Sequence, residues 1–199
     1  MRRHHYLYGE ERIIKPETVW LPFSGNEEEF FPGNIDRENK IGFSGSLTES
    51  VNYYDIRRKA VSELTNCRYL KDEGKHLRKN YPDILRSYRG FLSCNGGTLY
   101  TPMAKMFEIM LSKTALLSNK LYFNDILFDN EECFFEYKDD CSDIIKKAEI
   151  ILNSDIGEVV DSAYKKAIKY HTDSKRIIEL YNILKAVVTE EEIPKVWRQ

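Results

Sequence analysis

A lysine and a glutamate that follow a glycine-rich turn are the side chains in this sequence best placed for chemistry. Lys105 and Glu108 are three residues apart, so they would share one face of a helix. They follow Asn95-Gly96-Gly97 and the pair Thr101-Pro102, which is typical of the first residues of a helix. A helix N-terminus beside a lysine can bind an anion such as a phosphate. The alternative is a surface ion pair between Lys105 and Glu108, which would stabilise the fold only slightly.

A second turn of small residues, Gly45-Ser46, follows a short apolar segment at 41–44. Without a side chain at the glycine, the backbone N–H groups of such a turn can approach a phosphate closely. An ordinary connection between a strand and a helix is the alternative. Ligands of open α/β sheets bind at the carboxyl ends of the strands, so both turns are candidate parts of a ligand site.

Short apolar segments alternate with amphipathic ones from residue 40 onward, and this alternation predicts the fold. The clearest helix has an apolar stripe at Met103, Met106, Phe107, Met110 and Leu111. Strands are expected at 41–44, 68–70, 90–94, 115–118 and 133–137. Other helices are expected at 52–66, at 83–89 and over the last 60 residues, where one stripe comprises Ile177, Ile178, Tyr181, Leu184 and Val188. We predict an α/β fold with a Rossmann-like, open, mainly parallel sheet, helices on both faces and a helical C-terminal end.

Turn-forming residues divide the chain into three parts. Pro22, Gly25, Pro32 and Gly33 interrupt the first 40 residues and argue against regular structure there. We therefore predict an N-terminal arm or linker at 1–39, the Rossmann-like domain at 40–188, and a C-terminal tail at 189–199.

Composition excludes several classes of protein. Thirty basic and 32 acidic residues give a net charge of −2, which argues against nucleic-acid binding. No apolar segment approaches the roughly 20 residues that a membrane span requires, and we expect neither a transmembrane segment nor a signal peptide. The four cysteines are scattered, which predicts reduced thiols and a cytoplasmic location. The sequence has no metal-ligand spacing, no dinucleotide or P-loop motif and no nucleophile elbow.

Five segments resemble, in order, sequence blocks of glycosyltransferases with the GT-B fold. The most specific is 105–119 (KMFEIMLSKTALLSN), which is similar to K-x-F-E-x-M-A-x-G-x-x-L-L-T-[ND]. The others are 20–23 (WLPF), 41–46 (IGFSGS), 54–57 (YDIR), and His171-Thr172 followed by Arg176 and Leu180. The resemblance extends over about residues 20–184 and is strongest to the C-terminal, nucleotide-sugar-binding domain of the group-1, CgeB-like branch.

The resemblance implies a domain that binds the nucleotide half of a nucleoside-diphosphate sugar, whose sugar is then transferred to an acceptor. Glu108 would accept hydrogen bonds from the ribose hydroxyls, since a carboxylate can bind a vicinal diol. Lys105 and the start of its helix would face the diphosphate, and Arg57 would contact a phosphate or form a structural pair. No metal or other cofactor is implied. The implied binding residues are Gly45, Ser46, Arg57, Asn95, Tyr100, Thr101, Met103, Ala104, Lys105 and Glu108.

The sequence also departs from the family pattern. Many GT-B enzymes have a second glutamate where this chain has Tyr100, and a glycine where it has Lys113. The chain begins near the expected interdomain linker, so the implied partners include an N-terminal acceptor domain, a separate partner chain or a second copy. The alternative function is a non-catalytic interaction module that keeps the fold without donor chemistry. A receiver- or flavodoxin-like domain ranks lower, because no acidic cluster follows the first strand.

Overall fold

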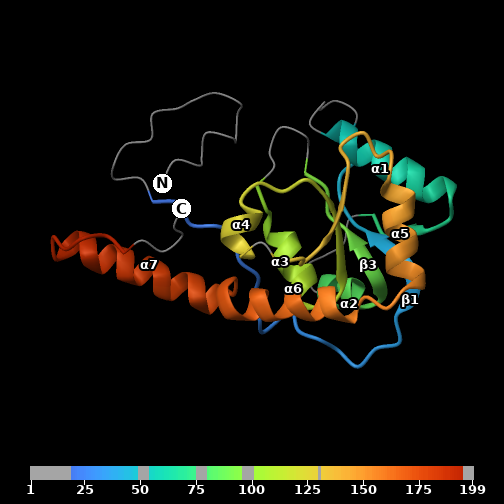
Figure 1. Ribbon diagram of the computed structural model, residues 1–199. Coiled ribbons are helices and arrows are strands. Elements are labelled where there is room, and N and C mark those ends of the chain that lie inside the picture. Colours follow the sequence, from blue (N-terminus) through green and yellow to red (C-terminus); the bar gives the residue numbers. More distant parts are fainter. Residues whose placement is uncertain (1–18, 49–53, 75–79, 96–100, 130, 195–199) are drawn as a thin grey trace.

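A five-stranded parallel sheet forms the centre of the molecule in the computed structural model, which describes residues 19–48, 54–74, 80–95, 101–129 and 131–194 (Figure 1). The strand order is β2-β1-β3-β4-β5, and every neighbouring pair is parallel. The strands are β1 (Glu38–Phe43), β2 (Leu70–Asp72), β3 (Tyr88–Leu92), β4 (Ala115–Asn119) and β5 (Phe135–Tyr137). The predicted Rossmann-like α/β fold is therefore confirmed.

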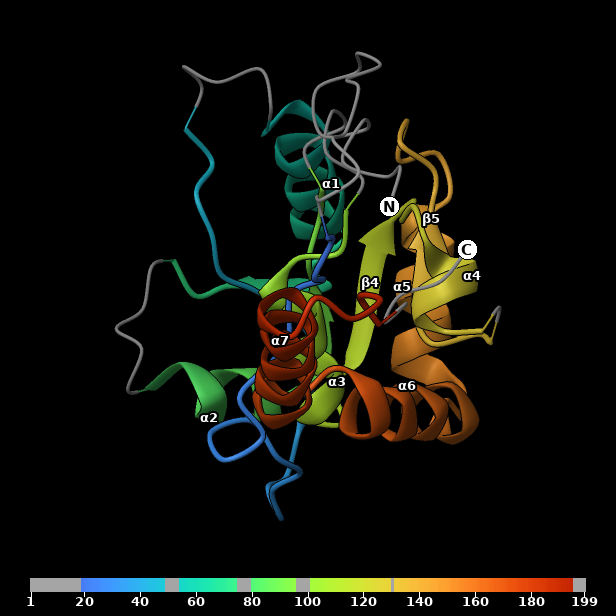
Figure 2. The same cartoon turned by 90° about the vertical axis from the view of Figure 1, so that its left-hand side faces the viewer.

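Helices cover both faces of this sheet (Figure 2). Each face has its own apolar cluster. α1 and α5 pack on one face, while α2, α3 and α6 lie on the other. The helices are α1 (Asp55–Asn66), α2 (Tyr81–Arg86), α3 (Ala104–Leu111), α4 (Asn124–Leu127), α5 (Ile144–Asn153), α6 (Gly157–Tyr170) and α7 (Asp173–Val188). Among the described helices, none is both long and apolar enough to cross a membrane.

The predicted helix at 83–89 is wrong at its C-terminal end. α2 ends at Arg86, and Tyr88 already belongs to β3, where it pairs with Glu38 of β1. The backbone N–H of Glu38 donates to the carbonyl of Ser87, so strand pairing begins immediately after the helix. Pairing with a distant strand overrides the local helical pattern at these residues.

The start of α3 also differs from the prediction. The helix begins at Ala104, and Met103 precedes it in an extended conformation with φ −99° and ψ 160°. Thr101 is therefore not the N-cap, and Pro102 is not the first helical residue. Met103 is 40% exposed, whereas the other four residues of the predicted stripe, Met106 to Leu111, are buried.

The predicted arm at 1–39 is described from residue 19, its last two residues already belong to β1, and residues 19–37 lie against the sheet domain. Phe30 is buried in the apolar cluster of the α3 face, and the Trp20 ring lies 5.1 Å from the ring of Phe123. Gly25 forms an isolated parallel bridge with Thr172, which directly precedes α7. The division of the chain at residue 39 stays a prediction.

The apolar stripe predicted on the last helix is not part of the core. Ile177, Ile178, Tyr181, Leu184 and Val188 of α7 are all exposed, and the buried side chains of this helix are Ile183 and Ala186. α7 extends beyond the body of the molecule in Figure 1. The periodicity correctly predicted a helix, but the assignment of its buried face was wrong.

Two glycines in the central strands allow side chains to approach the sheet closely. A Cβ at Gly42 would lie 2.5 Å from the Tyr88 ring and 2.6 Å from the Phe91 ring. A Cβ at Gly90 would lie 2.8 Å from Ile41 and from Ile151 of α5, on the other face of the sheet. Neighbouring side chains thus pack closely on β1 and β3 because these two glycines have no side chain.

We expect Gly42→Ala to destabilise the protein by about 1–3 kcal/mol, because the added methyl group overlaps two buried aromatic rings. Urea denaturation followed by circular dichroism measures the free energy of unfolding. Gly157→Ala is the matched control, since its nearest neighbour is the side chain of Asp155 at 3.3 Å. The control should change stability by less than about 0.5 kcal/mol. Equal stability of the two variants would contradict the packing argument.

Candidate functional site

The carboxyl ends of β1, β3 and β4 meet at one edge of the sheet and carry a cluster of polar groups. β3 lies between β1 and β4, with Gly42 paired to Phe91 and Leu92 paired to Leu117. Ser44 and Gly45 follow β1, Asn95 follows β3, and Asn119 ends β4. The parallel register therefore brings together the two turns that the sequence marked as candidate parts of one site.

Arg57 of α1 connects the turn after β1 with the turn after β3. Its guanidinium donates to the carbonyl of Ser46 at 3.3 Å and to the carbonyl of Cys94 at 2.9 Å. It also stacks over the Tyr54 ring, with the guanidinium carbon 4.4 Å from the ring centroid. Of the two roles that the sequence left open, the structure shows the structural one.

Lys105 lies beside the turn after β1. Its ammonium donates to the carbonyl of Ser44, and a Cβ at Gly45 would be 3.8 Å from Lys105 Nζ. Burial and then the positive charge of Arg57 lower the pKa of Lys105 to about 8, although Glu108 acts in the opposite direction. A hydrogen bond to one carbonyl uses one of the three ammonium donors, so Lys105 can also bind an anion.

Asn95 carries the least satisfied polar side chain of the site. It is fully buried, and neither its amide nitrogen nor its amide oxygen has a hydrogen-bond partner among the described residues. Its backbone N–H donates to Asn119 Oδ1 at 2.8 Å, and Asn119 Nδ2 donates to Asp139 at 2.9 Å. A buried polar group without a partner costs about 1–3 kcal/mol, so a ligand that bonds to it gains that much.

Glu108 lies one turn after Lys105 on α3 and is half-buried. The loop at Gly25 packs tightly on the backbone here, since a Cβ at Gly25 would be 3.3 Å from the Glu108 nitrogen and 2.7 Å from Leu111. Burial, with a contribution from the negative charge of Glu108, raises the pKa of Tyr81. Lys105 Nζ is 5.8 Å from the Tyr81 ring, so these three residues share one region.

The structure brings most of the sequence-predicted residues together. Gly45, Ser46, Arg57, Asn95 and Lys105 surround the ends of β1 and β3, and Glu108 follows on α3. Ala104 is the first residue of α3, with Met103 and Thr101 preceding it. Tyr100 lies outside the described residues.

Sequence reasoning missed three polar residues of this edge. Ser44 supplies the carbonyl that accepts from Lys105, and its hydroxyl donates to the Gly74 carbonyl at 2.8 Å. Asn119 and Asp139 position the backbone of Asn95. Their position directly after strand segments was the available signal, because side chains at strand carboxyl ends face the ligand edge.

His171, in the last of the resembling segments, has a structural role. Its ring stacks on Phe107 of α3 at 4.5 Å, and Nε2–H donates to the Leu127 carbonyl at 2.8 Å. Arg176 Nη2 lies 3.4 Å from Nδ1, which therefore accepts. The His171 carbonyl accepts from the Gly25 N–H at 3.0 Å. His171 thus joins α3, α4 and the 19–37 segment while it remains neutral.

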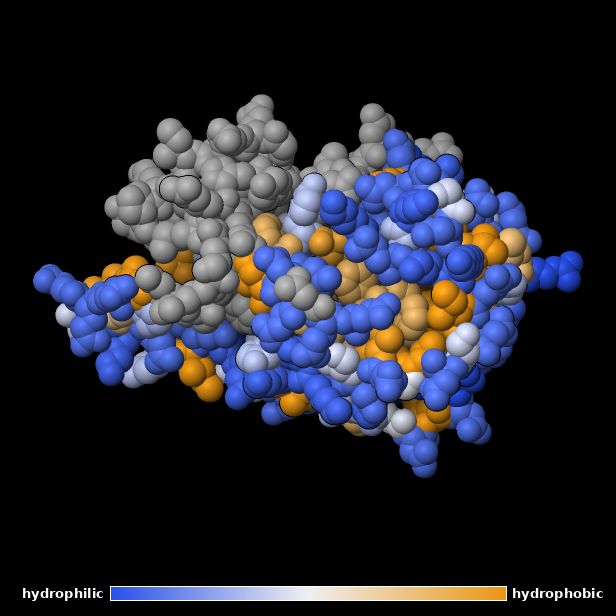
Figure 3. Space-filling model, in the orientation of Figure 1, coloured by the Kyte–Doolittle hydropathy of each residue, from blue (hydrophilic) through white to orange (hydrophobic). Residues whose placement is uncertain are grey.

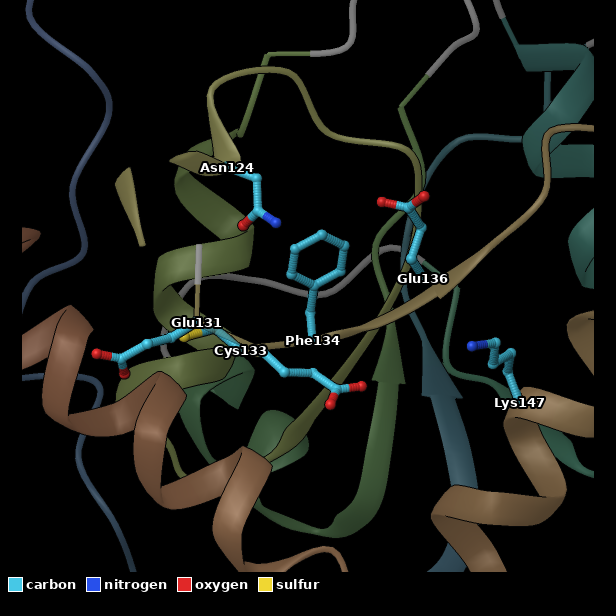
Figure 4. A pocket seen from close by; sticks show the side chains of 7 residues that line it. Asn124, Glu131, Cys133, Phe134, Glu136 and Lys147 are labelled. Carbon is cyan, nitrogen blue, oxygen red and sulfur yellow. The ribbon is translucent and has the colours of Figure 1, made fainter. Parts of the chain in front are cut away.

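A pocket of different character lies at β5, the edge strand (Figure 4). Its lining includes Phe134, Asn124 and Lys147 together with Glu131, Glu132 and Glu136. Glu131 already accepts from Ser162 and forms an ion pair with Lys166 at 2.7 Å. Within the described ranges, no group of three or more His, Cys, Asp or Glu side chains is arranged to hold a metal ion.

Solved glycosyltransferases share this fold. A glycosyltransferase from Rickettsia africae superposes with a TM-score of 0.66 at 12% identity, over 95% of this chain and 62% of its own. A glycosyltransferase involved in avilamycin A biosynthesis gives 0.61 at 11% identity, over 88% and 60%. The pneumococcal O-GlcNAc transferase GtfA, solved with UDP and GlcNAc, gives 0.56 at 12% identity, over 94% and 42%.

The fold is thus that of the GT-B glycosyltransferases, as the sequence resemblance implied. The chain spans about three fifths of the length of the first two structures. Comparisons with models of protein families and with curated protein sequences found no match.

The buried state of His171 predicts a pH dependence of stability. Burial lowers the pKa of His171 to about 4, while an unfolded chain has the ordinary value of about 6.5. Below pH 6.5 the unfolded state therefore binds a proton that the folded state rejects. This contribution to stability is complete above pH 6.5 and is lost as the pH falls toward 4, by about 3 kcal/mol in total.

His171→Gln keeps an amide donor for Leu127 but cannot titrate in this range. Urea denaturation at pH 7.5, 6.0 and 5.0 should show a steeper loss of stability for the wild type than for this variant. Parallel pH profiles of the two proteins would contradict the neutral, buried assignment.

Proposed function

We propose that this chain is the donor half of a glycosyltransferase and binds the nucleoside-diphosphate part of a nucleotide sugar. The observation that carries the proposal is the cluster at the carboxyl ends of β1 and β3. There the ammonium of Lys105 lies beside Gly45, and the buried amide of Asn95 has no hydrogen-bond partner among the described residues, in a GT-B fold. Such a cluster offers two kinds of donor to an anionic ligand.

Charge is the second support for the proposal. Lys105 lies in the first turn of α3, where the backbone N–H groups of the helix add to its positive potential. Arg57 contributes a second cation nearby, as its effect on the pKa of Lys105 indicates. These groups would bind the diphosphate and stabilise its charge as the bond to the sugar breaks.

Glu108 is the proposed contact for the ribose. Its carboxylate lies one helical turn beyond Lys105, so a ligand with its diphosphate at Lys105 would extend its nucleoside along α3. A carboxylate accepts two hydrogen bonds from the 2′- and 3′-hydroxyls. The pneumococcal relative was solved with UDP, which makes UDP the first nucleotide to test.

We expect Glu108→Ala to weaken nucleoside-diphosphate binding by about 1.5–3 kcal/mol, because a charge-assisted hydrogen bond to ribose is lost. Isothermal titration calorimetry with UDP, GDP, ADP and TDP measures this difference. Thermal shift gives an independent readout, since a ligand at 100 times its dissociation constant adds about 2.7 kcal/mol of stability.

Glu158→Ala is the matched control, since Glu158 is an exposed glutamate of α6 outside the cluster. It should leave the affinity unchanged. If Glu108→Ala binds nucleoside diphosphates as tightly as the wild type, Glu108 does not contact the ribose. Binding of none of the four nucleotides would favour the interaction module, which the exposed apolar side of α7 also supports.

The lowered pKa of Lys105 predicts that nucleotide binding depends on pH. Because its pKa is about 8 in the free protein, the ammonium loses its charge as the pH rises from 7 to 9.5. The affinity for a nucleoside diphosphate should fall over this range. Lys105→Met should bind more weakly at pH 7 and show no such fall. A flat wild-type profile would exclude Lys105 from contact with the diphosphate.

A further inference from the structure

Tyr81 is the first residue of α2, and its hydroxyl group lies in an unusual environment. The side chain is half-buried, and within the described ranges its hydroxyl oxygen is shielded from water and has no hydrogen-bond partner. Buried polar groups in proteins are nearly always paired, so an unpaired hydroxyl requires an explanation. Such a group costs stability in the free protein, and a ligand that accepts a hydrogen bond from it offsets that cost.

The Tyr81 ring lies beside the two side chains proposed to contact the nucleotide. Lys105 Nζ is 5.8 Å from the centre of the ring. The same ammonium donates to the carbonyl of Ser44, so the ring, the lysine and the turn after β1 form one continuous group. Burial, and then the negative charge of Glu108, raises the pKa of Tyr81. The effect of that charge indicates that the Glu108 carboxylate also lies near the Tyr81 hydroxyl.

Neighbouring elements hold the Tyr81 ring in place. The Phe30 ring meets it edge-on, with the ring centres 6.1 Å apart and an angle of 77° between the planes. Phe30 is itself buried in the apolar cluster of the α3 face. Pro82 follows in the first turn of α2, where a backbone N–H has no partner within the helix. The hydroxyl is therefore held in position before a ligand binds, which reduces the entropy lost on binding.

We propose that the Tyr81 hydroxyl donates a hydrogen bond to the α-phosphate of the nucleotide, the phosphate that is attached to the ribose. This inference rests on the proposed donor site, in which Lys105 binds the diphosphate and Glu108 binds the ribose. A side chain that lies beside both residues faces the part of the ligand that joins diphosphate and ribose. That part is the α-phosphate, whose charged oxygens are strong hydrogen-bond acceptors.

The protonation state of Tyr81 suits a hydrogen-bond donor. A tyrosine hydroxyl ordinarily has a pKa of about 10, and burial raises the pKa of Tyr81 further. The hydroxyl therefore stays neutral at physiological pH and donates its proton without adding charge to the site. The ammonium of Lys105 is a mobile point charge, whereas a hydroxyl on a fixed ring bonds to an oxygen at one position. Tyr81 would thus position the phosphate that Lys105 attracts.

Tyr81→Phe removes the hydroxyl and leaves the ring. Isothermal titration calorimetry compares this variant with the wild type for uridine, UMP and UDP, or for the corresponding set if GDP, ADP or TDP binds more tightly than UDP. UMP and UDP should bind the variant about tenfold more weakly, because a hydrogen bond to a charged group is lost. Uridine has no phosphate and should bind both proteins equally.

Tyr164→Phe is the matched control. Tyr164 is also half-buried and also lies beside a lysine, since Lys113 Nζ is 5.1 Å from the centre of its ring. It belongs to α6, which lies on the face of the molecule drawn in Figure 3, where hydrophilic side chains predominate along this helix. The variant should bind all three ligands as tightly as the wild type.

The stability of the free protein gives a second readout, which requires no ligand. Tyr81→Phe should be at least as stable to urea as the wild type, because the hydroxyl it lacks has no partner in the described part of the chain. Tyr88→Phe should be less stable, since the Tyr88 hydroxyl donates to Glu73. An equal loss of stability in Tyr81→Phe would mean that the protein itself satisfies the Tyr81 hydroxyl, and it would overturn the inference.

The binding results distinguish this inference from the proposed function. If Glu108→Ala weakens the binding of UMP and UDP but Tyr81→Phe does not, the donor site stands and Tyr81 is not a contact. If Tyr81→Phe weakens uridine as much as UDP, the hydroxyl contacts the nucleoside and the α-phosphate assignment is wrong. If no nucleotide binds to the wild type, the proposed function fails, and the Tyr81 contact fails with it.

Discussion

Close packing of side chains on both faces of β1 and β3 is the constraint on which the rest of the structure depends. The Tyr88 and Phe91 rings approach β1 at Gly42, and α5 approaches β3 at Gly90, because neither glycine has a side chain. These two contacts lie on opposite faces of the sheet. They hold the two central strands in a register in which Ser44 and Asn95 emerge at the same edge. The position of the candidate site is thus a consequence of packing in the middle of the sheet.

Most polar groups at that edge are satisfied by the protein itself. Arg57 binds the carbonyls of Ser46 and Cys94, and Asn119 binds the backbone of Asn95. Within the described residues, the side-chain amide of Asn95 has no hydrogen-bond partner, and Lys105 keeps further donors beyond its bond to Ser44. Buried polar groups in proteins are normally paired, which is why these groups carry the proposed ligand site.

The sequence predicted local structure well wherever one face of a segment is apolar. The stripe from Met106 to Leu111 is buried as expected, and the helix expected at 52–66 buries Ala60, Val61 and Leu64 in α1. The sequence-based prediction failed where pairing with a distant segment of the chain determines the conformation. Tyr88 pairs with Glu38 across a gap of 50 residues, and no local pattern reveals such pairing.

The candidate site, too, was predicted only in part from the sequence. Residue type and order alone marked Gly45, Lys105 and Glu108, because glycine turns and charged side chains after strands are readable from a single sequence. Only the tertiary structure gave Arg57 its bridging role, joined Asn95 to Asn119 and Asp139, and placed Lys105 at Ser44, since these contacts join residues from separate elements.

Periodicity in α7 determined that the segment is helical and that it has an apolar face. It did not determine which way that face points. Hydrogen bonds from Arg176 to the backbone of Phe23 and Tyr170 fix the rotation of the helix, and they leave the apolar face toward solvent. A sequence thus encodes which side chains share a face, because helical geometry is local. Which surface covers that face is decided by contacts between distant residues, and these exist only in the folded chain.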